Sequence, residues 1–141
     1  MDSPLKVLLV EDSKDDCFFF ERAFRRSGVV GQLFIAEDGF EAMQFLGQQG
    51  RFASPAEAPR PDVIFLDLKM PGANGFDVLR WIQKRSLTTR VVVLSGSQEL
   101  HDQEAAFQLG AEAYLVKPVT PEQIADILAA SSKSPQSQSQ P

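Results

Sequence analysis

The apolar residues of this chain fall in short unbroken runs with little alternation between apolar and polar positions. Such runs, rich in β-branched residues, predict strands that are covered on both faces. Four clear runs and one weaker run lie at residues 6–10, 63–66, 90–94, 113–116 and, most weakly, 32–36. We therefore expect a sheet that is buried on both sides.

Between these runs the apolar residues recur with the period of a helix. Ser13 can cap a helix that extends to about residue 27, where Gly28 follows as a stop signal. Pro121, a favourable first helical residue, opens the last predicted helix. Three further helices are predicted at residues 39–46, 76–84 and 98–109. Strands that alternate with helices predict an α/β domain with a doubly wound parallel sheet.

Two segments lack a clear period. Residues 47–61 contain three prolines and predict a long loop, and loops of this length are usually functional or disordered. Residues 131–141 are rich in serine, glutamine and proline and predict a disordered tail. The sequence thus predicts one domain, residues 1–130, followed by this tail.

Composition narrows the classes of function. The net charge of -5 argues against a nucleic-acid-binding surface, because such a surface needs clustered basic residues. Cys17 is the single cysteine, so an internal disulfide cannot form and a cytoplasmic setting is expected. No signal peptide is recognisable, and no apolar run approaches the roughly 20 residues of a membrane helix. These features predict no contact with nucleic acid or membrane.

Polar side chains follow four of the predicted strands. Glu11 and Asp12 come directly after the first strand, and Asp67 comes directly after the apolar run of the third. Ser95 and Lys117 stand at the same point of the fourth and fifth strands. Because ligands of an open parallel sheet bind outside the carboxyl ends of its strands, we expect these five side chains to form one site.

Three carboxylates crowded at one edge repel each other, by about 4 kcal/mol per pair at about 4 Å and an effective dielectric near 20. A bound cation relieves this repulsion, and an all-oxygen site suits Mg²⁺. Asp67 is then a candidate nucleophile that attacks phosphorus and forms an aspartyl phosphate. Lys117 would supply a second positive charge and Ser95 a hydroxyl for a phosphoryl oxygen.

Four segments around these residues resemble, in order and spacing, the receiver domain of bacterial two-component response regulators. They read VLLVED, IFLDLKMPGANGFDVL, VVVLSGS and AYLVKPVT, and the likeness extends from about residue 5 to about residue 130. It implies a single-domain, CheY-like (flavodoxin-like) α/β fold, in which a five-stranded parallel sheet of order 2-1-3-4-5 carries helices on both faces.

The resemblance also implies roles for individual residues at the ends of the first and third strands. Asp67 corresponds to the phosphoacceptor, which takes its phosphoryl group from a sensor histidine kinase. Asp12 corresponds to a direct Mg²⁺ ligand, beside Asp67 and the backbone carbonyl of Lys69. Glu11 stands where the family commonly has an aspartate that reaches the metal through water. Lys69 lies beside the site, and we hypothesise that it affects the lifetime of the phosphoryl group.

The remaining implied roles concern the later strands. Lys117 would contact the phosphoryl group, and its peptide bond to Pro118 is expected to be cis. Ser95 and Tyr114 correspond to the switch pair of the family. Phosphorylation would draw the Ser95 hydroxyl inward and make room for the Tyr114 ring, which would remodel the face of the last two helices.

The implied output is protein contact, with a downstream protein as target, because no DNA-binding segment follows the domain. Self-association into a homodimer through the same face is left open. The start VEDSKDD and the loop at 47–61 resemble those of single-domain regulators that are paired with phytochrome-type histidine kinases.

Two other functions compete with this interpretation. A phosphohydrolase of the haloacid-dehalogenase type also uses a strand-end aspartate, but it typically needs a second aspartate two residues later as general acid, where Lys69 stands here. A flavin-binding protein of the flavodoxin type needs a phosphate-cradling loop after the first strand, and EDSKDD has the wrong charge for that.

The phenylalanine-rich segment at 17–24 divides into two faces. Helical spacing places Phe20, Ala23 and Phe24 together as core residues. Phe18 lies about 200° away from Phe20 at about 100° per residue, and is expected to be exposed. Whether it packs against a neighbouring helix or contacts a partner is left open.

Overall fold

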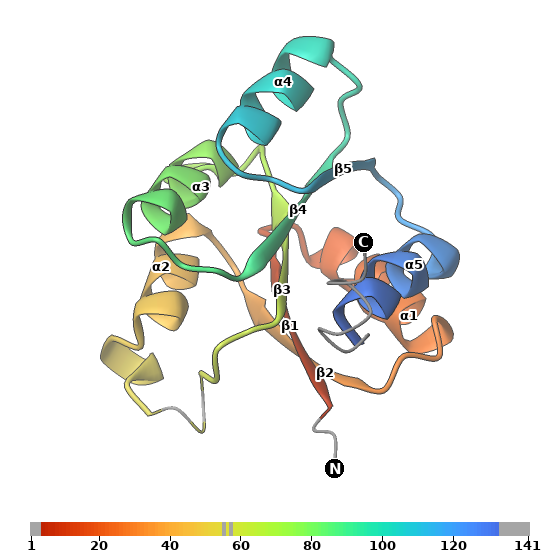
Figure 1. Ribbon diagram of the computed structural model, residues 1–141, viewed down its shortest axis with the longest axis horizontal. Coiled ribbons are helices and arrows are strands. Elements are labelled where there is room, and N and C mark those ends of the chain that lie inside the picture. Colours follow the sequence, from red (N-terminus) through yellow and green to blue (C-terminus); the bar gives the residue numbers. More distant parts are fainter. Residues whose placement is uncertain (1–3, 55, 57, 133–141) are drawn as a thin grey trace, which may run out of the picture.

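The five apolar runs of the sequence form the five strands of one parallel sheet (Figure 1). The computed structural model describes residues 4–54, 56 and 58–132. Every pair of neighbouring strands is parallel, and the strand order is β2-β1-β3-β4-β5, as predicted. The strands are Leu5–Val10 (β1), Gly31–Ala36 (β2), Val63–Asp67 (β3), Arg90–Ser95 (β4) and Ala113–Val116 (β5).

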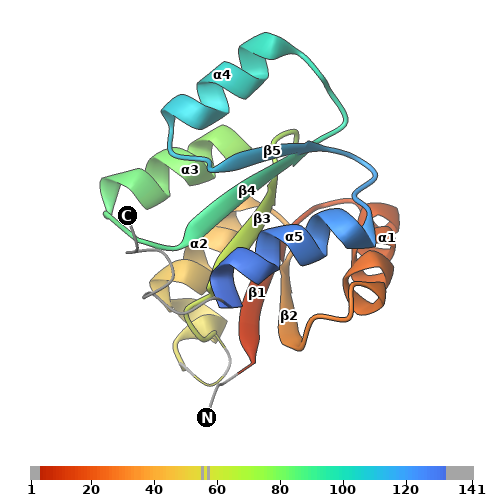
Figure 2. The same cartoon turned by 45° about the vertical axis from the view of Figure 1, so that its right-hand side comes forward.

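Helices cover both faces of the sheet, as Figures 1 and 2 show. Helices α1 and α5 lie side by side on one face, and α2 and α3 lie on the other. The helices are Lys14–Arg26 (α1), Gly39–Gly47 (α2), Gly75–Lys84 (α3), Leu100–Gln108 (α4) and Pro121–Ser132 (α5). Within the described residues, none of them is long and apolar enough to cross a membrane.

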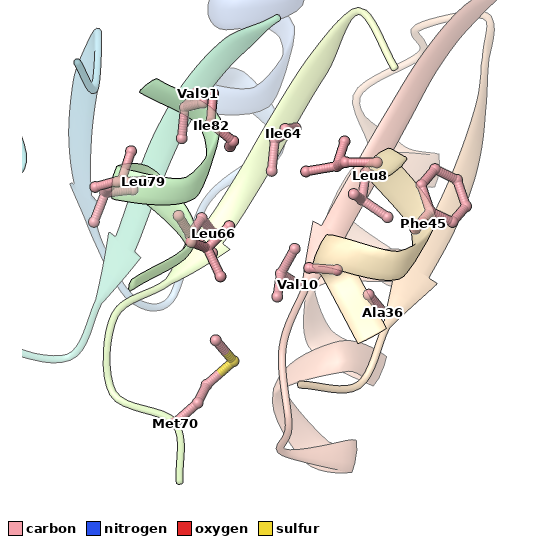
Figure 3. Close-up of a cluster of buried hydrophobic side chains, with 14 of the residues drawn as sticks. Leu8, Val10, Ala36, Phe45, Ile64, Leu66, Met70, Leu79, Ile82 and Val91 are labelled. Carbon is pink, nitrogen blue, oxygen red and sulfur yellow. The ribbon is translucent and has the colours of Figure 1, made fainter. Parts of the chain in front are cut away.

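Two apolar clusters, one on each side of the sheet, explain why the strand sequences do not alternate. Along β3, Val63 and Phe65 pack toward α1 and α5, whereas Ile64 and Leu66 pack toward α2 and α3. Figure 3 shows the cluster on the side of α2 and α3, where the side chain of Met70 lies near the carboxyl end of the sheet. Since both faces are apolar, the buried polar side chains Glu11, Asp67 and Ser95 stand where the strands end.

The first helix confirms the predicted core and cap. The Ser13 hydroxyl accepts a hydrogen bond from the Asp16 N–H, and Gly28 follows the helix in a left-handed conformation with φ of 78°. Phe20, Ala23 and Phe24 are buried. Two neighbouring phenylalanines on the opposite side of the helix, Phe18 and Phe19, are 55% and 53% exposed.

The segment at 47–61, which was predicted to be a long loop, contains some regular structure and contributes to the core. It contains a short 3-10 helix, Gly50–Phe52, and buries the side chains of Phe52 and Ala58. The Phe52 ring lies 5.2 Å from the Phe45 ring of α2, between centroids. Two isolated apolar residues fill a gap in the core here, and they produce no period that a sequence pattern can reveal.

The carboxyl-terminal boundary also differs slightly from the prediction. Helix α5 extends to Ser132, two residues beyond the predicted end of the domain at 130. Residues 133–141 of the predicted disordered tail lie outside the described residues.

Candidate functional site

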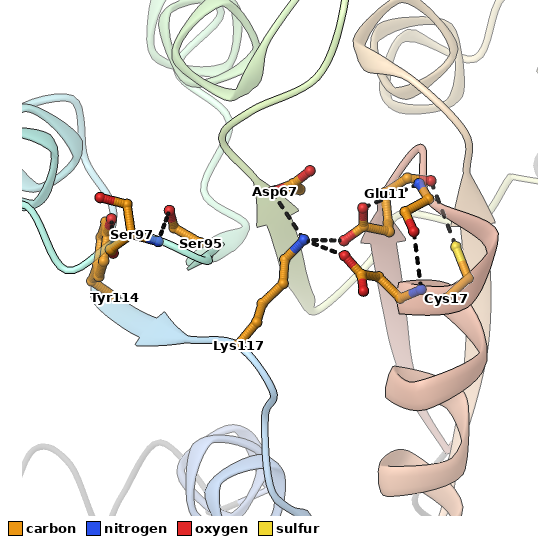
Figure 4. Close-up of polar contacts among 9 residues, drawn as sticks. Glu11, Cys17, Asp67, Ser95, Ser97, Tyr114 and Lys117 are labelled. Carbon is orange, nitrogen blue, oxygen red and sulfur yellow. Dashed lines mark hydrogen bonds and ion pairs between the residues drawn. The ribbon is translucent and has the colours of Figure 1, made fainter.

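The polar residues at the strand ends come together at one edge of the sheet (Figure 4). Asp67 ends β3 and Ser95 ends β4, while Glu11 directly follows β1 and Lys117 directly follows β5. Among the described residues, the buried polar side chains are those of Glu11, Asp67 and Ser95, which are 2%, 3% and 0% exposed. Burial of polar groups is costly, so their grouping at one place indicates a site.

Three carboxylates form an acidic cluster at this edge. Glu11, Asp12 and Asp67 can each offer one oxygen, and these oxygens all lie within 4.8 Å of one another. Glu11 and Asp67 are buried, whereas Asp12 is exposed and opens the cluster to solvent. The cluster lines an open depression of 390 Å³. Carboxylate oxygens at this spacing fit a hard divalent cation such as Mg²⁺.

Lys117 lies against the acidic cluster, and its ammonium has three carboxylate neighbours. Lys117 Nζ is 2.8 Å from Glu11 Oε1, 2.8 Å from Asp16 Oδ2 and 3.2 Å from Asp67 Oδ1. Sequence reasoning placed Glu11 and Asp67 at the same edge as Lys117 and missed Asp16, which α1 contributes from its first turn. The run EDSKDD contained a signal for Asp16, because a helix beginning at Lys14 keeps its first turn close to the end of β1.

Burial and the neighbouring charges shift the pKa values of Glu11, Asp67 and Lys117. Burial, with the negative charge of Asp67, raises the pKa of Glu11 from 4.5 to about 7, although Lys117 opposes the change. Burial likewise raises the pKa of Asp67 against the opposing charge of Lys117. Burial acts to lower the pKa of Lys117, but its hydrogen bonds to Asp16 and Glu11 outweigh that effect and raise it. The carboxylates therefore outnumber the positive charge available to them, which favours a bound cation.

Ser95 and Tyr114 are connected through a third residue. The Ser95 hydroxyl accepts a hydrogen bond from the Ser97 N–H at 3.1 Å, and the Tyr114 hydroxyl donates to the Ser97 carbonyl at 2.9 Å. Figure 4 shows this chain on the β4–β5 side of the site. Sequence reasoning identified both ends and missed Ser97, whose backbone atoms make the contacts.

The loop after Asp67 is held against α3 by a glycine. A Cβ atom on Gly75 would lie 2.6 Å from the Asp67 carbonyl oxygen, so the close approach of the helix requires glycine here. Lys69 lines the depression, and its Nζ lies 3.5 Å from Asp102 Oδ2 of α4. The peptide bond between Lys117 and Pro118 is cis, the isomer that was expected.

The chain matches the model of one protein family, the response regulator receiver domain, over residues 7–129. The chain belongs to this family. Response regulator Rcp1 of Synechocystis sp. is 39% identical over 116 residues, which cover 81% of this chain and 77% of Rcp1. Its solved structure, a Mn²⁺-bound form, superposes with a TM-score of 0.73 at 35% identity and covers 90% of this chain and 91% of Rcp1.

Two further solved structures are similar. The phosphorylated cyanobacterial phytochrome response regulator RcpA has a TM-score of 0.76 at 35% identity, with 91% of each chain covered. The bacteriophytochrome response regulator RtBRR has a TM-score of 0.80 at 34% identity, with 94% of this chain and 80% of RtBRR covered.

Family membership decides between the competing functions. Receiver domains receive phosphate from histidine kinases, so the chain is a response regulator with a phosphoacceptor role in two-component signalling. The phosphohydrolase of the haloacid-dehalogenase type is thereby rejected. The geometry agrees, since the position of its general acid holds Lys69, whose ammonium pairs with Asp102.

Proposed function

We propose that Asp67 is the residue that accepts the phosphoryl group from the histidine kinase. The observation that carries the proposal is the buried Asp67 carboxylate, which lies in the acidic cluster and 3.2 Å from the Lys117 ammonium. A carboxylate oxygen of Asp67 attacks phosphorus, the bond between phosphorus and the kinase imidazole nitrogen breaks, and the imidazole keeps the electron pair. The product is an aspartyl phosphate.

We infer that a divalent cation, Mg²⁺ in the cell, binds at the acidic cluster. Asp12 and Asp67 would hold it directly with the Lys69 carbonyl, and Glu11 would reach it through water. The donor set supports this assignment, as does the Mn²⁺-bound form of Rcp1. A cation there neutralises charge on the phosphoryl oxygens during transfer. Lys117 supplies a further positive charge, and Ser95 offers its hydroxyl to a phosphoryl oxygen.

The signal then passes to the α4–β5–α5 face. In this structure the Ser95 hydroxyl accepts a hydrogen bond from the Ser97 N–H. When the hydroxyl turns to the phosphoryl group, this hydrogen bond breaks. Because the Tyr114 hydroxyl donates to the carbonyl of the same residue, a shift of Ser97 would let the Tyr114 ring take a second position. The remodelled face would bind a downstream protein or a second copy of the chain. In this role the protein is phosphorylated and dephosphorylated, and it does not turn over an external substrate.

We further propose that the cognate kinase is of the phytochrome type. This proposal rests on the likeness to RcpA and RtBRR, whose names describe them as phytochrome and bacteriophytochrome response regulators. Phosphotransfer from a phytochrome-type kinase that is faster than from a chemotaxis-type kinase supports the assignment, and equal or slower transfer contradicts it.

Intact mass spectrometry tests the phosphoacceptor. The protein is incubated with acetyl phosphate and Mg²⁺, and one phosphoryl group is expected to add. EDTA and Asp67→Asn should each abolish the gain, whereas Asp126→Asn, an exposed aspartate of α5, should keep it. A folded wild-type protein that gains no phosphate would contradict the proposal, and so would a gain that survives in Asp67→Asn.

A further inference from the structure

Asp16 is a charged neighbour of the site that the proposed function does not use. It lies in the first turn of α1, where its backbone N–H is fixed by the Ser13 hydroxyl at 3.2 Å. Its Oδ2 is 2.8 Å from Lys117 Nζ, closer than Asp67 Oδ1 at 3.2 Å. Asp16 is not one of the carboxylates that gather within metal-binding distance of each other. It lines the same depression as the acidic cluster and is bonded there to Lys117.

The Lys117 ammonium donates hydrogen bonds to Glu11 and Asp16 and forms an ion pair with Asp67. An ammonium carries three N–H groups, and Glu11, Asp16 and Asp67 each lie within reach of one. To donate to a phosphoryl group on Asp67, the ammonium would have to turn away from Glu11 or Asp16 and give up one of these two hydrogen bonds. Glu11 and Asp67 belong to the acidic cluster, whereas Asp16 holds the ammonium toward α1.

The charge balance points the same way. A divalent cation together with Lys117 would neutralise Glu11, Asp12 and Asp67. Asp16 adds a fourth negative charge, which the cation and Lys117 do not balance. Its side chain is only 39% exposed, so water screens this charge incompletely. An incoming phosphoryl group, itself negative, therefore meets an extra repulsion.

We propose that Asp16 is a positioning residue that competes with the phosphoryl group for the Lys117 ammonium and so restrains phosphorylation of this receiver domain. The inference rests on the proposed function of Asp67. The opposite role, in which Asp16 holds Lys117 in the orientation that phosphorylation needs, predicts an effect of the opposite sign when the carboxylate is removed.

The test compares Asp16→Asn with Asp15→Asn at saturating Mg²⁺. Asp15 is exposed in the same helical turn, so its replacement removes the same charge from the helix start. Fluorine NMR titration with beryllofluoride, a mimic of the phosphoryl group, measures binding to Asp67. We expect about fivefold tighter binding in Asp16→Asn, the low end of typical coupling because Asp16 is partly exposed. Asp15→Asn should match the wild type.

A second measurement separates competition from general damage. Calorimetric titration with Mg²⁺ alone should show weaker binding in Asp16→Asn. Without Asp16, the Lys117 ammonium pairs more closely with Glu11 and Asp67 and so competes with Mg²⁺ for their carboxylates. Damage to the fold would weaken the binding of both ligands, whereas competition moves them in opposite directions. Unchanged or weaker beryllofluoride binding in Asp16→Asn would overturn the inference.

The mass measurement on the wild type keeps the two proposals apart. If the wild type takes up phosphate but Asp16→Asn binds beryllofluoride no more tightly, the inference fails alone. If the folded wild type takes up none, the role of Asp67 fails first, and the inference falls with it.

Discussion

The two halves of the site are held together by different forces. On the β1–β3 side, buried carboxylates surround the Lys117 ammonium at 2.8 to 3.2 Å. On the β4–β5 side, Ser95 and Tyr114 are joined by neutral hydrogen bonds to the backbone of Ser97. Breaking a buried ion pair costs several times more than losing one neutral hydrogen bond. The charged half is therefore suited to sense phosphate and metal, and the neutral half to move.

Removal of the shared cation should give the largest effect. Lys117→Met leaves Glu11 and Asp67 buried without their partner, and we expect the metal-free protein to lose about 3 kcal/mol of unfolding free energy at pH 8. Mg²⁺ should restore much of the loss, because it supplies the missing charge. Urea unfolding with and without Mg²⁺ measures both values. Lys84→Met, an exposed lysine of α3, is the control; an equal loss in both variants would contradict this account of the charged half.

The charged half of the site should also make the stability of the protein depend on pH. The pKa of Glu11 is about 7 in the folded protein, above its ordinary value of 4.5. Between these values the folded state binds more protons than the unfolded state, so the free energy of unfolding falls as pH rises through this window. We expect a loss on the order of 2 kcal/mol between about pH 4.5 and pH 7 in the metal-free protein.

Urea unfolding across this window, with Glu11→Gln as the matched variant, measures the effect. Glu11→Gln should flatten the pH profile, because the amide keeps the size of the side chain and does not titrate. Stability that rises with pH across the window in the wild type would contradict the account.

Much of the fold followed from sequence because apolar runs and helix caps are short-range patterns, and the positions of the strand ends then followed from parallel pairing. Apolar runs gave the five strands, and parallel pairing then brought Asp67 and Lys117 to one edge, although 50 positions separate them along the chain. Ser13 and Gly28 marked the first helix, because caps and left-handed turns favour particular residue types.

The missed features depend on how the elements pack. Asp16 looks like an ordinary acidic residue at a helix start, and the packing of α1 beside α5, with its first turn near the end of β1, brings it to Lys117. Ser97 acts through its N–H and carbonyl, which every residue except proline possesses. Phe52 and Ala58 fill a gap in the core from a segment with no period. Each half of the site therefore contains one residue that the sequence pattern did not reveal, Asp16 in the charged half and Ser97 in the neutral half, and the long loop contains two.

A single hydroxyl tests the neutral half. Tyr114→Phe keeps the ring but removes the donor to the Ser97 carbonyl, so we expect a loss of about 1 kcal/mol in unfolding free energy. Mg²⁺ affinity should stay at the wild-type value, because this half carries no charge of the acidic cluster. Ser97→Ala is the comparison variant, since it keeps the backbone atoms that link Ser95 to Tyr114 and removes only the hydroxyl, which accepts from the Glu99 N–H. A change in Mg²⁺ affinity in Tyr114→Phe would show that the two halves are not separable.

The smallest effect is expected from a substitution of Lys69, which lines the depression but directs its ammonium to Asp102 of α4. Its ammonium lies 3.5 Å from Asp102 Oδ2, and its side chain is 62% exposed, so the pair contributes little to stability. Lys69→Ala removes a cation from the edge of the depression and opens a path for water to the aspartyl phosphate. We expect dephosphorylation to become about twofold faster, which corresponds to a few tenths of a kcal/mol.

The decay of the phosphorylated form, followed by intact mass after acetyl phosphate is removed, measures this rate. Lys84→Ala on the outer side of α3 should decay like the wild type. An unchanged rate in Lys69→Ala would remove Lys69 from the account of phosphoryl lifetime. Control of the lifetime would then lie with the buried groups around Lys117, and the ion pair with Asp102 would serve only to connect the loop after β3 with α4.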